Sequence, residues 1–64
     1  MNANLQKAMQ MAIDEENKSN ANYRQLAKEA EDQETRLLFE QLANEEAMHA
    51  KKLTERLKNL KMMG

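Results

Sequence analysis

Glu46 and His49 have the residue types and the spacing that best fit a chemical role in this 64-residue sequence. They form a Glu-x-x-His pair, and residues three apart share one face of an α-helix, so an oxygen and a nitrogen donor can reach one point. Glu16, thirty residues before Glu46, offers a second carboxylate. Mixed carboxylate and imidazole donors suit iron or manganese, and zinc can occupy the same groups. These three residues therefore predict a metal site.

Helices must bring these residues together, and the composition favours helices throughout. Ala, Leu, Met, Glu, Lys, Gln and Arg occupy 47 of the 64 positions, valine and proline are absent, and the sole glycine is the last residue. This composition excludes a sheet protein and predicts an all-α fold. We expect a single helical-hairpin domain over residues 1–64, with one helix over about 3–30, a turn near 31–33 and a second helix over about 34–61.

The turn is predicted from polar residues, because no glycine or proline marks it. Asp32 is a good N-cap, and Glu34 suits the positive first turn of a new helix. The alternative is one continuous helix, roughly 90 Å long at 1.5 Å per residue. However, the apolar stripe that reaches Ala30 would fall out of phase with the stripe through Phe39 and Leu42. This shift of phase favours the hairpin.

Each predicted helix carries an apolar seam with spacings of three and four, as in packed helical bundles. The seam residues are Leu5, Met9, Ala12, Tyr23, Leu26 and Ala30 in the first half and Phe39, Leu42, Leu53, Leu57 and Leu60 in the second. Near its middle the first seam is interrupted by Glu16 and Ser19, and the second by Glu46 and His49. In an antiparallel hairpin, residues whose numbers add up to about 63 lie side by side, so both interruptions lie about 22 Å from the turn.

One hairpin provides two carboxylates and one imidazole, and two helices cannot enclose a site. A twofold dimer would form a four-helix bundle with four Glu and two His at one level, which is a ligand set for two metal ions. Four carboxylates in a bundle core would repel one another, and no Lys or Arg lies near them on either seam. Two divalent cations would cancel the four charges. We therefore expect a homodimer or higher homo-oligomer with two metal ions per dimer.

Each candidate residue also has a structural alternative. Glu16 and Glu46 could be solvated carboxylates, and His49 could be a hydrogen-bonded histidine of the core. Tyr23 follows Glu16 by one heptad on the same face. Its hydroxyl could hydrogen-bond a metal ligand and so support catalysis, or its ring could simply fill core volume. The coincidence of level, face and ligand type favours the metal site.

Charge and hydropathy limit the other function classes. Ten basic and eleven acidic residues give a net charge of −1 and are interspersed along the sequence, which argues against nucleic-acid or membrane partners. No apolar run approaches the roughly 18 residues of a membrane span, and the sequence begins without a basic signal-peptide region. Cysteine is absent, which excludes thiolate redox centres and zinc ribbons. We expect a cytoplasmic protein.

The residues around the candidate ligands resemble the ferritin-like superfamily, specifically rubrerythrin-type domains and encapsulated ferritins. The resemblance covers roughly residues 12 to 57 and rests on Glu16, Tyr23, Leu26, Ala27 and the segment Phe39-Glu40-Gln41-Leu42-Ala43-Asn44-Glu45-Glu46-Ala47-Met48-His49-Ala50. In those families the first-helix Glu and the Glu-x-x-His pair are di-iron ligands. The resemblance implies that Glu46 bridges two irons and that Glu16 and His49 are terminal ligands.

The resemblance also implies how the site is completed. Rubrerythrins and ferritins carry two such halves in one chain, whereas encapsulated ferritins carry one half and rebuild the site between subunits, as this sequence would. We expect no encapsulin shell as a partner, since no docking tail is recognisable at the end of the sequence. The implied activity is ferroxidase-type oxidation of Fe(II) by dioxygen or peroxide. Two alternatives stay open: a helical-hairpin interaction module whose polar layer fixes register, and a bundle that binds zinc or manganese without redox turnover.

Overall fold

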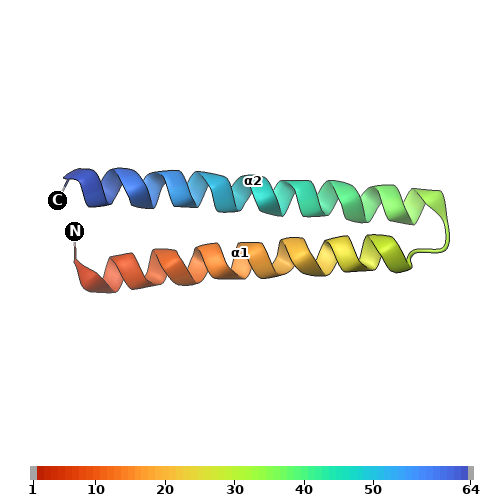
Figure 1. Cartoon of the computed structure of the whole chain (residues 1–64), viewed down its shortest axis with the longest axis horizontal. Helices are drawn as coiled ribbons and strands as arrows, with labels where there is room; N and C mark the ends of the chain where they lie inside the picture. The colour runs from red at the N-terminus through yellow and green to blue at the C-terminus, as the bar shows by residue number, and fades with distance from the viewer. Residues whose placement is uncertain (1, 64) are drawn as a thin grey trace.

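A computed structural model describes residues 2–63 as two long helices joined by a short turn (Figure 1). Helix α1 spans Ala3–Glu29 and helix α2 spans Gln33–Met63. The helices run side by side in opposite directions, so the two termini lie at one end of a molecule whose Cα atoms span 49 × 15 × 10 Å. The prediction of an all-helical hairpin is confirmed. Residues 1 and 64 of the predicted domain lie outside the described residues.

Capping side chains mark where both helices begin. Asn2 Oδ1 accepts a hydrogen bond from the Leu5 amide at 2.7 Å, and Asp32 Oδ2 accepts one from the Thr35 amide at 2.8 Å. The bond from Thr35 lowers the pKa of Asp32, because it favours the charged carboxylate. At the end of α1, Ala30 has an extended backbone with φ −66° and ψ 132°. The chain therefore turns without a glycine and restarts at Asp32.

The two helices pack through small and apolar residues at heptad spacing. The buried members are Ile13 and Ala27 of α1 and Ala43, Ala50 and Leu57 of α2. The half-buried Asn20 occupies the position between Ile13 and Ala27. We call these six residues the buried seam. Because Ala43 and Ala50 are small, the two helices can approach closely along it.

The seams predicted from the sequence lie beside the buried seam rather than within it. Among their apolar members only Leu57 is buried, and Leu5 and Leu26 are 46% and 40% exposed. The half-buried residues on this side are Met9, Ala12, Glu16, Ser19 and Tyr23 of α1 and Phe39, Leu42, Glu46, Leu53 and Leu60 of α2, and we call them the open seam. One hairpin therefore covers most of the predicted seam residues only in part. The alanines of the neighbouring stripe, which are small, make the closer contact between the helices.

Charges that are mixed along the sequence separate along the folded hairpin. The end that holds the termini, residues 2–13 and 50–63, contains six Lys and Arg and one acidic residue. The part toward the turn, residues 14–49, contains four Lys and Arg and ten Asp and Glu. The hairpin causes this separation by bringing the first and last residues to the same end. Neither α1 nor α2, as described here, contains a stretch long and apolar enough to cross a lipid bilayer.

Candidate metal centre

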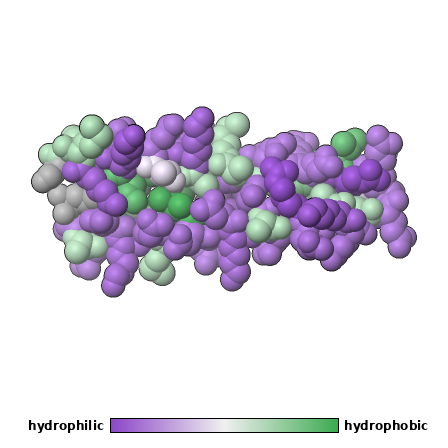
Figure 2. Space-filling view, in the orientation of Figure 1, coloured by the Kyte–Doolittle hydropathy of each residue, from purple (hydrophilic) through white to green (hydrophobic). Residues whose placement is uncertain are grey.

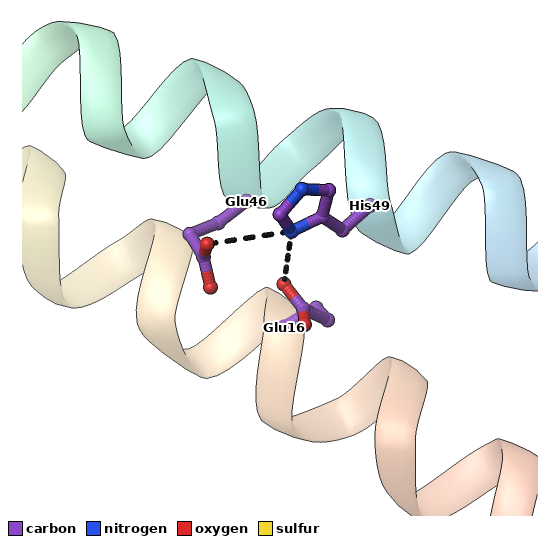
Figure 3. A group of neighbouring side chains, drawn as sticks. All are labelled: Glu16, Glu46 and His49. Carbon is purple, nitrogen blue, oxygen red and sulfur yellow. Dashed lines mark hydrogen bonds and ion pairs between the residues drawn. The ribbon is translucent and has the colours of Figure 1, made fainter.

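Glu16 of α1 and Glu46 and His49 of α2 converge half-way along the hairpin (Figure 3). One donor atom of each lies within 4.8 Å of the other two. His49 Nδ1 is 3.3 Å from Glu16 Oε2 and 3.5 Å from Glu46 Oε1. Donors about 2.1 Å from one metal ion lie about 3.0 Å apart at octahedral angles and about 3.4 Å apart at tetrahedral angles. The two distances from His49 Nδ1 therefore suit donors that share one metal ion.

Helix geometry explains why the three side chains meet. Glu46 and His49 are three residues apart and project from the same face of α2, toward α1 (Figure 3). Glu16 is the central residue of α1, which extends thirteen residues on either side of it. Since both helices rise equally per residue from the turn, Glu16 reaches the level of the Glu-x-x-His pair. The level predicted from residue numbers thus agrees with the folded chain.

The two carboxylates of this cluster lie close enough to perturb each other. The hydrogen bond with the Glu16 carboxyl group raises the pKa of Glu46 above its ordinary value, and desolvation and the negative charge of Glu16 add to this shift. Among the ion pairs of residues 2–63, Glu16 and Glu46 both pair with His49. A proton between two carboxylates relieves their repulsion, and a divalent cation would do the same with more charge. The donor set therefore also fits a metal ion in charge.

The three side chains of the cluster are partly exposed. The side chains of Glu16 and Glu46 are 26% and 23% exposed, whereas that of His49 is 52% exposed. Helix α2 is uppermost in both Figure 1 and Figure 3, but it runs from right to left in Figure 1 and from left to right in Figure 3. Figure 3 therefore views the side of the hairpin that faces away from the viewer in Figure 1. The side seen in Figure 2 is mostly hydrophilic, with hydrophobic atoms in a hollow toward the terminal end. The cluster thus belongs to the side that carries the open seam.

Tyr23, the predicted supporting residue, lies on the open seam beyond Glu16. Its ring stacks against Phe39 with the ring centroids 6.1 Å apart and an angle of 24° between the planes. The structure therefore places the ring in a packing contact between the two helices. Among the hydrogen bonds of residues 2–63, none joins the Tyr23 hydroxyl to the cluster, so its role toward a metal ligand stays a prediction.

Asn20 is the residue near the site that sequence reasoning missed. Its Nδ2 atom donates a hydrogen bond of 2.7 Å to the main-chain carbonyl of Ala43 on the other helix. Asn20 lies one turn after Glu16, and Ala43 lies one turn before Glu46. The seven-residue spacing of Ile13, Asn20 and Ala27 could have indicated Asn20, because it places the three residues on one stripe of the helix.

Comparison with known families agrees with this arrangement. The family model described as Rubrerythrin matches residues 1–62, a range that includes both helices nearly in full and all three residues of the cluster. The chain belongs to the rubrerythrin family. The hairpin is consistent with one half of a ferritin-like, rubrerythrin-type domain. Searches among curated proteins and among solved structures give no match. Membership of the rubrerythrin family and the Glu16, Glu46 and His49 cluster together suggest a di-iron protein.

Proposed function

We propose that this chain is a di-iron carboxylate protein that assembles its metal centre between two copies and oxidises Fe(II). The observation that carries the proposal is the convergence of Glu16, Glu46 and His49 at one point of a rubrerythrin-family hairpin. Each copy contributes two carboxylates and one imidazole, which is half of the usual ligand set for two iron ions. A second copy related by a twofold axis doubles this set at one level.

The open seam supports a second copy as the group that completes the site. The cluster lies among apolar side chains that one hairpin covers only in part, such as Leu42 and Leu53. A four-helix bundle would cover these side chains and the exposed edge of His49 together. Burial of the apolar groups favours association, and the metal ions offset the repulsion of four Glu carboxylates.

The charge distribution supports an antiparallel pairing of the two hairpins. Because Glu16 lies at the centre of α1, a twofold axis through the site and across the hairpins overlaps them along their whole length. The basic terminal end of each copy then lies beside the partner's turn, which carries Glu31, Asp32 and Glu34. A parallel pair would instead place two basic ends side by side, which like-charge repulsion disfavours.

A spin label near the turn distinguishes the two pairings. The chain has no native cysteine, so a Lys28→Cys variant accepts a single label. In the antiparallel dimer each label lies twelve residues from Glu16 on opposite sides of the twofold axis, so the two labels are about 36 Å apart along the bundle at 1.5 Å per residue. Labels held within about 20 Å of each other, roughly two helix diameters, would show a parallel pair instead.

The proposed reaction takes Fe(II) as its substrate. Two Fe(II) ions lose one electron each, and these electrons with two protons reduce dioxygen to hydrogen peroxide or hydrogen peroxide to two molecules of water. The carboxylates of Glu16 and Glu46 favour the ferric product, because its greater charge interacts more strongly with them. The proposed function is therefore ferroxidase-type, and the cytoplasmic location stays a prediction from the sequence.

Aerobic oxidation of Fe(II), followed by near-ultraviolet absorbance, tests this proposal. The native chain should oxidise Fe(II) faster than a His49→Ala variant at matched iron concentration and pH, because loss of the imidazole weakens iron binding. Met48→Ala, which changes an exposed neighbour, is the matched control and should behave as the native chain does. Equal rates in the native chain and the His49→Ala variant would reject the ferroxidase and favour a polar layer that only fixes register.

A further inference from the structure

Asn20 is the polar member of an otherwise apolar buried seam. The α1 stripe reads Ile13, Asn20 and Ala27, and the facing α2 stripe consists of two alanines and a leucine. A carboxamide in such a position contributes less to burial than an aliphatic side chain of similar size. Its presence therefore calls for a reason other than hydrophobic stabilisation.

The hydrogen bond of Asn20 differs from the other contacts between the helices. Its Nδ2 atom lies 2.7 Å from the carbonyl oxygen of Ala43, a residue with 0% exposure. Among the hydrogen bonds that join α1 to α2 in residues 2–63, this one ends on a main-chain atom, whereas those of Arg24 and His49 end on side chains. A main-chain atom inside a helix cannot move independently, so the bond ties α1 to the backbone of α2 itself.

The turn sets the relative level of the two helices approximately, and apolar packing alone does not fix the small slides that remain. Contacts among alanines and aliphatic side chains are non-directional, whereas a short hydrogen bond requires one register. A slide of one residue moves α1 by about 1.5 Å. Metal ligands must stay within about 0.5 Å of their productive positions, so a site built across two helices needs such a device.

We propose that Asn20 is a positioning residue whose hydrogen bond to Ala43 sets the register of α1 against α2 and so holds Glu16 opposite Glu46 and His49. At 1.5 Å per residue, the bond acts about 6 Å along the helix axis from Glu16, about 4.5 Å from Glu46 and about 9 Å from His49. This inference deepens the proposed function and rests on it for its metal-binding consequence, while the register itself is a property of the hairpin. The Ala43 carbonyl lies within α2 and can keep its helical hydrogen bond when Asn20 is replaced.

An Asn20→Leu variant separates positioning from stability. Leucine fills a similar volume with an apolar group, so the metal-free variant should keep its helix content and melt at or above the native temperature. Its affinity for Co(II) should nevertheless fall by about 10- to 100-fold, the range seen when groups that orient metal ligands are changed, and the visible spectrum of bound Co(II) should change. A Co(II) affinity and spectrum equal to those of the native chain would overturn the proposal.

Arg24→Ala is the matched control, since it removes another hydrogen bond from α1 to α2. Arg24 donates to the Asn44 side chain at 2.8 Å, one turn beyond Asn20, but this contact is exposed and involves two side chains. We expect the Co(II) affinity and spectrum of this variant to match those of the native chain. A loss equal to that of Asn20→Leu would show that any contact between the helices suffices and would contradict a special role for Asn20.

Register can also be measured without metal, which keeps this inference distinguishable from the proposed function. Spin labels at Lys7→Cys and Lys58→Cys, both exposed, report the alignment of α1 and α2 when labelled chain is diluted with unlabelled chain. The native background should give one narrow distance, and Asn20→Leu a shifted or broader distribution. If Co(II) fails to bind even the native chain, the proposed function fails while this distance still tests Asn20. An unchanged distribution in Asn20→Leu would overturn the register role.

Discussion

The buried seam and the open seam run along the same two helices but differ in the size and polarity of their side chains and in how far one chain buries them. The buried seam consists mainly of alanine and aliphatic residues that one chain covers almost completely. The open seam contains larger side chains, among them Tyr23, Phe39 and Leu42, together with two carboxylates, and one chain covers these only in part. The first therefore closes the hairpin, whereas the second presents donor groups on a surface suited to a second copy. In the proposed dimer, separate stripes of a 64-residue chain would serve folding and assembly.

Among substitutions that test the difference between the two seams, Glu46→Ala in the open seam should have the largest effect on metal binding and melting temperature. Two metal ions should bind per pair of native chains and raise the melting temperature by on the order of 10 °C at a metal concentration about 100 times Kd, because metal binds the folded form. Glu46→Ala should lose both the binding and the rise, while its metal-free form is as stable as the native chain or more so, since one repelling carboxylate is removed. Titration calorimetry and thermal melts measure these effects.

The adjacent Glu45 provides the control for Glu46. Its side chain is exposed and lies outside the cluster, so Glu45→Ala should bind metal as the native chain does. If Glu46→Ala still bound two iron ions per pair of chains, the assignment of Glu46 as a ligand would be wrong.

Overpacking the buried seam should produce the next largest effect. Ala43 is completely buried, so Ala43→Leu must separate the helices or strain their side chains, at a cost of about 1–3 kcal/mol. For a domain of this size the melting temperature should fall by roughly 5–20 °C. Ala47→Leu adds the same side chain at an exposed position of α2 and should leave the melting temperature within a few degrees of native. Circular dichroism melts compare the two, and equal melting temperatures would show that the buried seam is not tightly packed.

The sequence predicted the hairpin and the cluster for the same physical reason. A helix repeats regularly, so the spacing of Glu46 and His49 and the level of Glu16 relative to the turn at Asp32 follow from residue numbers alone. The more deeply buried of the two stripes was not predicted, apart from Leu57. Alanine contributes weakly to an apolar pattern even where, as at Ala43, it is completely buried.

The hydrogen bond of Asn20 could not be predicted from residue spacing either. An asparagine in a helix is usually exposed, and its partner here is a main-chain carbonyl that leaves no trace in the sequence. Helix periodicity thus gives levels and faces, whereas which of two adjacent stripes becomes buried depends on side-chain size and on contacts across the hairpin.

Truncation of the open seam should weaken association more than it weakens the hairpin. Leu42→Ala and Leu53→Ala remove half-buried side chains on either side of the cluster. Together they should shift the dimer toward the monomer by about 10-fold or more in Kd, because their burial would be completed only by the second copy. Sedimentation at several concentrations measures the shift. Leu37→Ala, at a site that is 54% exposed, should leave the equilibrium unchanged, and a native chain that is monomeric at micromolar concentration would contradict the dimer.

The smallest effect is expected at the turn, where Asp32 affects both seams equally by setting the start of α2. Asp32→Ala removes the acceptor of the Thr35 amide and should lower the melting temperature by about 5 °C without changing the ratio of metal ions to chains. Because folding lowers the pKa of Asp32, the carboxylate stabilises the fold above its ordinary pKa of 3.8, and this contribution is lost as the pH falls below that value toward the lowered pKa. The difference in melting temperature between native and Asp32→Ala chains should therefore be constant near neutral pH and shrink in acid. Asp14→Ala, at an exposed position within α1, controls for the loss of one negative charge. A difference between native and Asp32→Ala that persisted unchanged well below pH 3.8 would show that the Asp32 carboxylate is not the group that stabilises the start of α2.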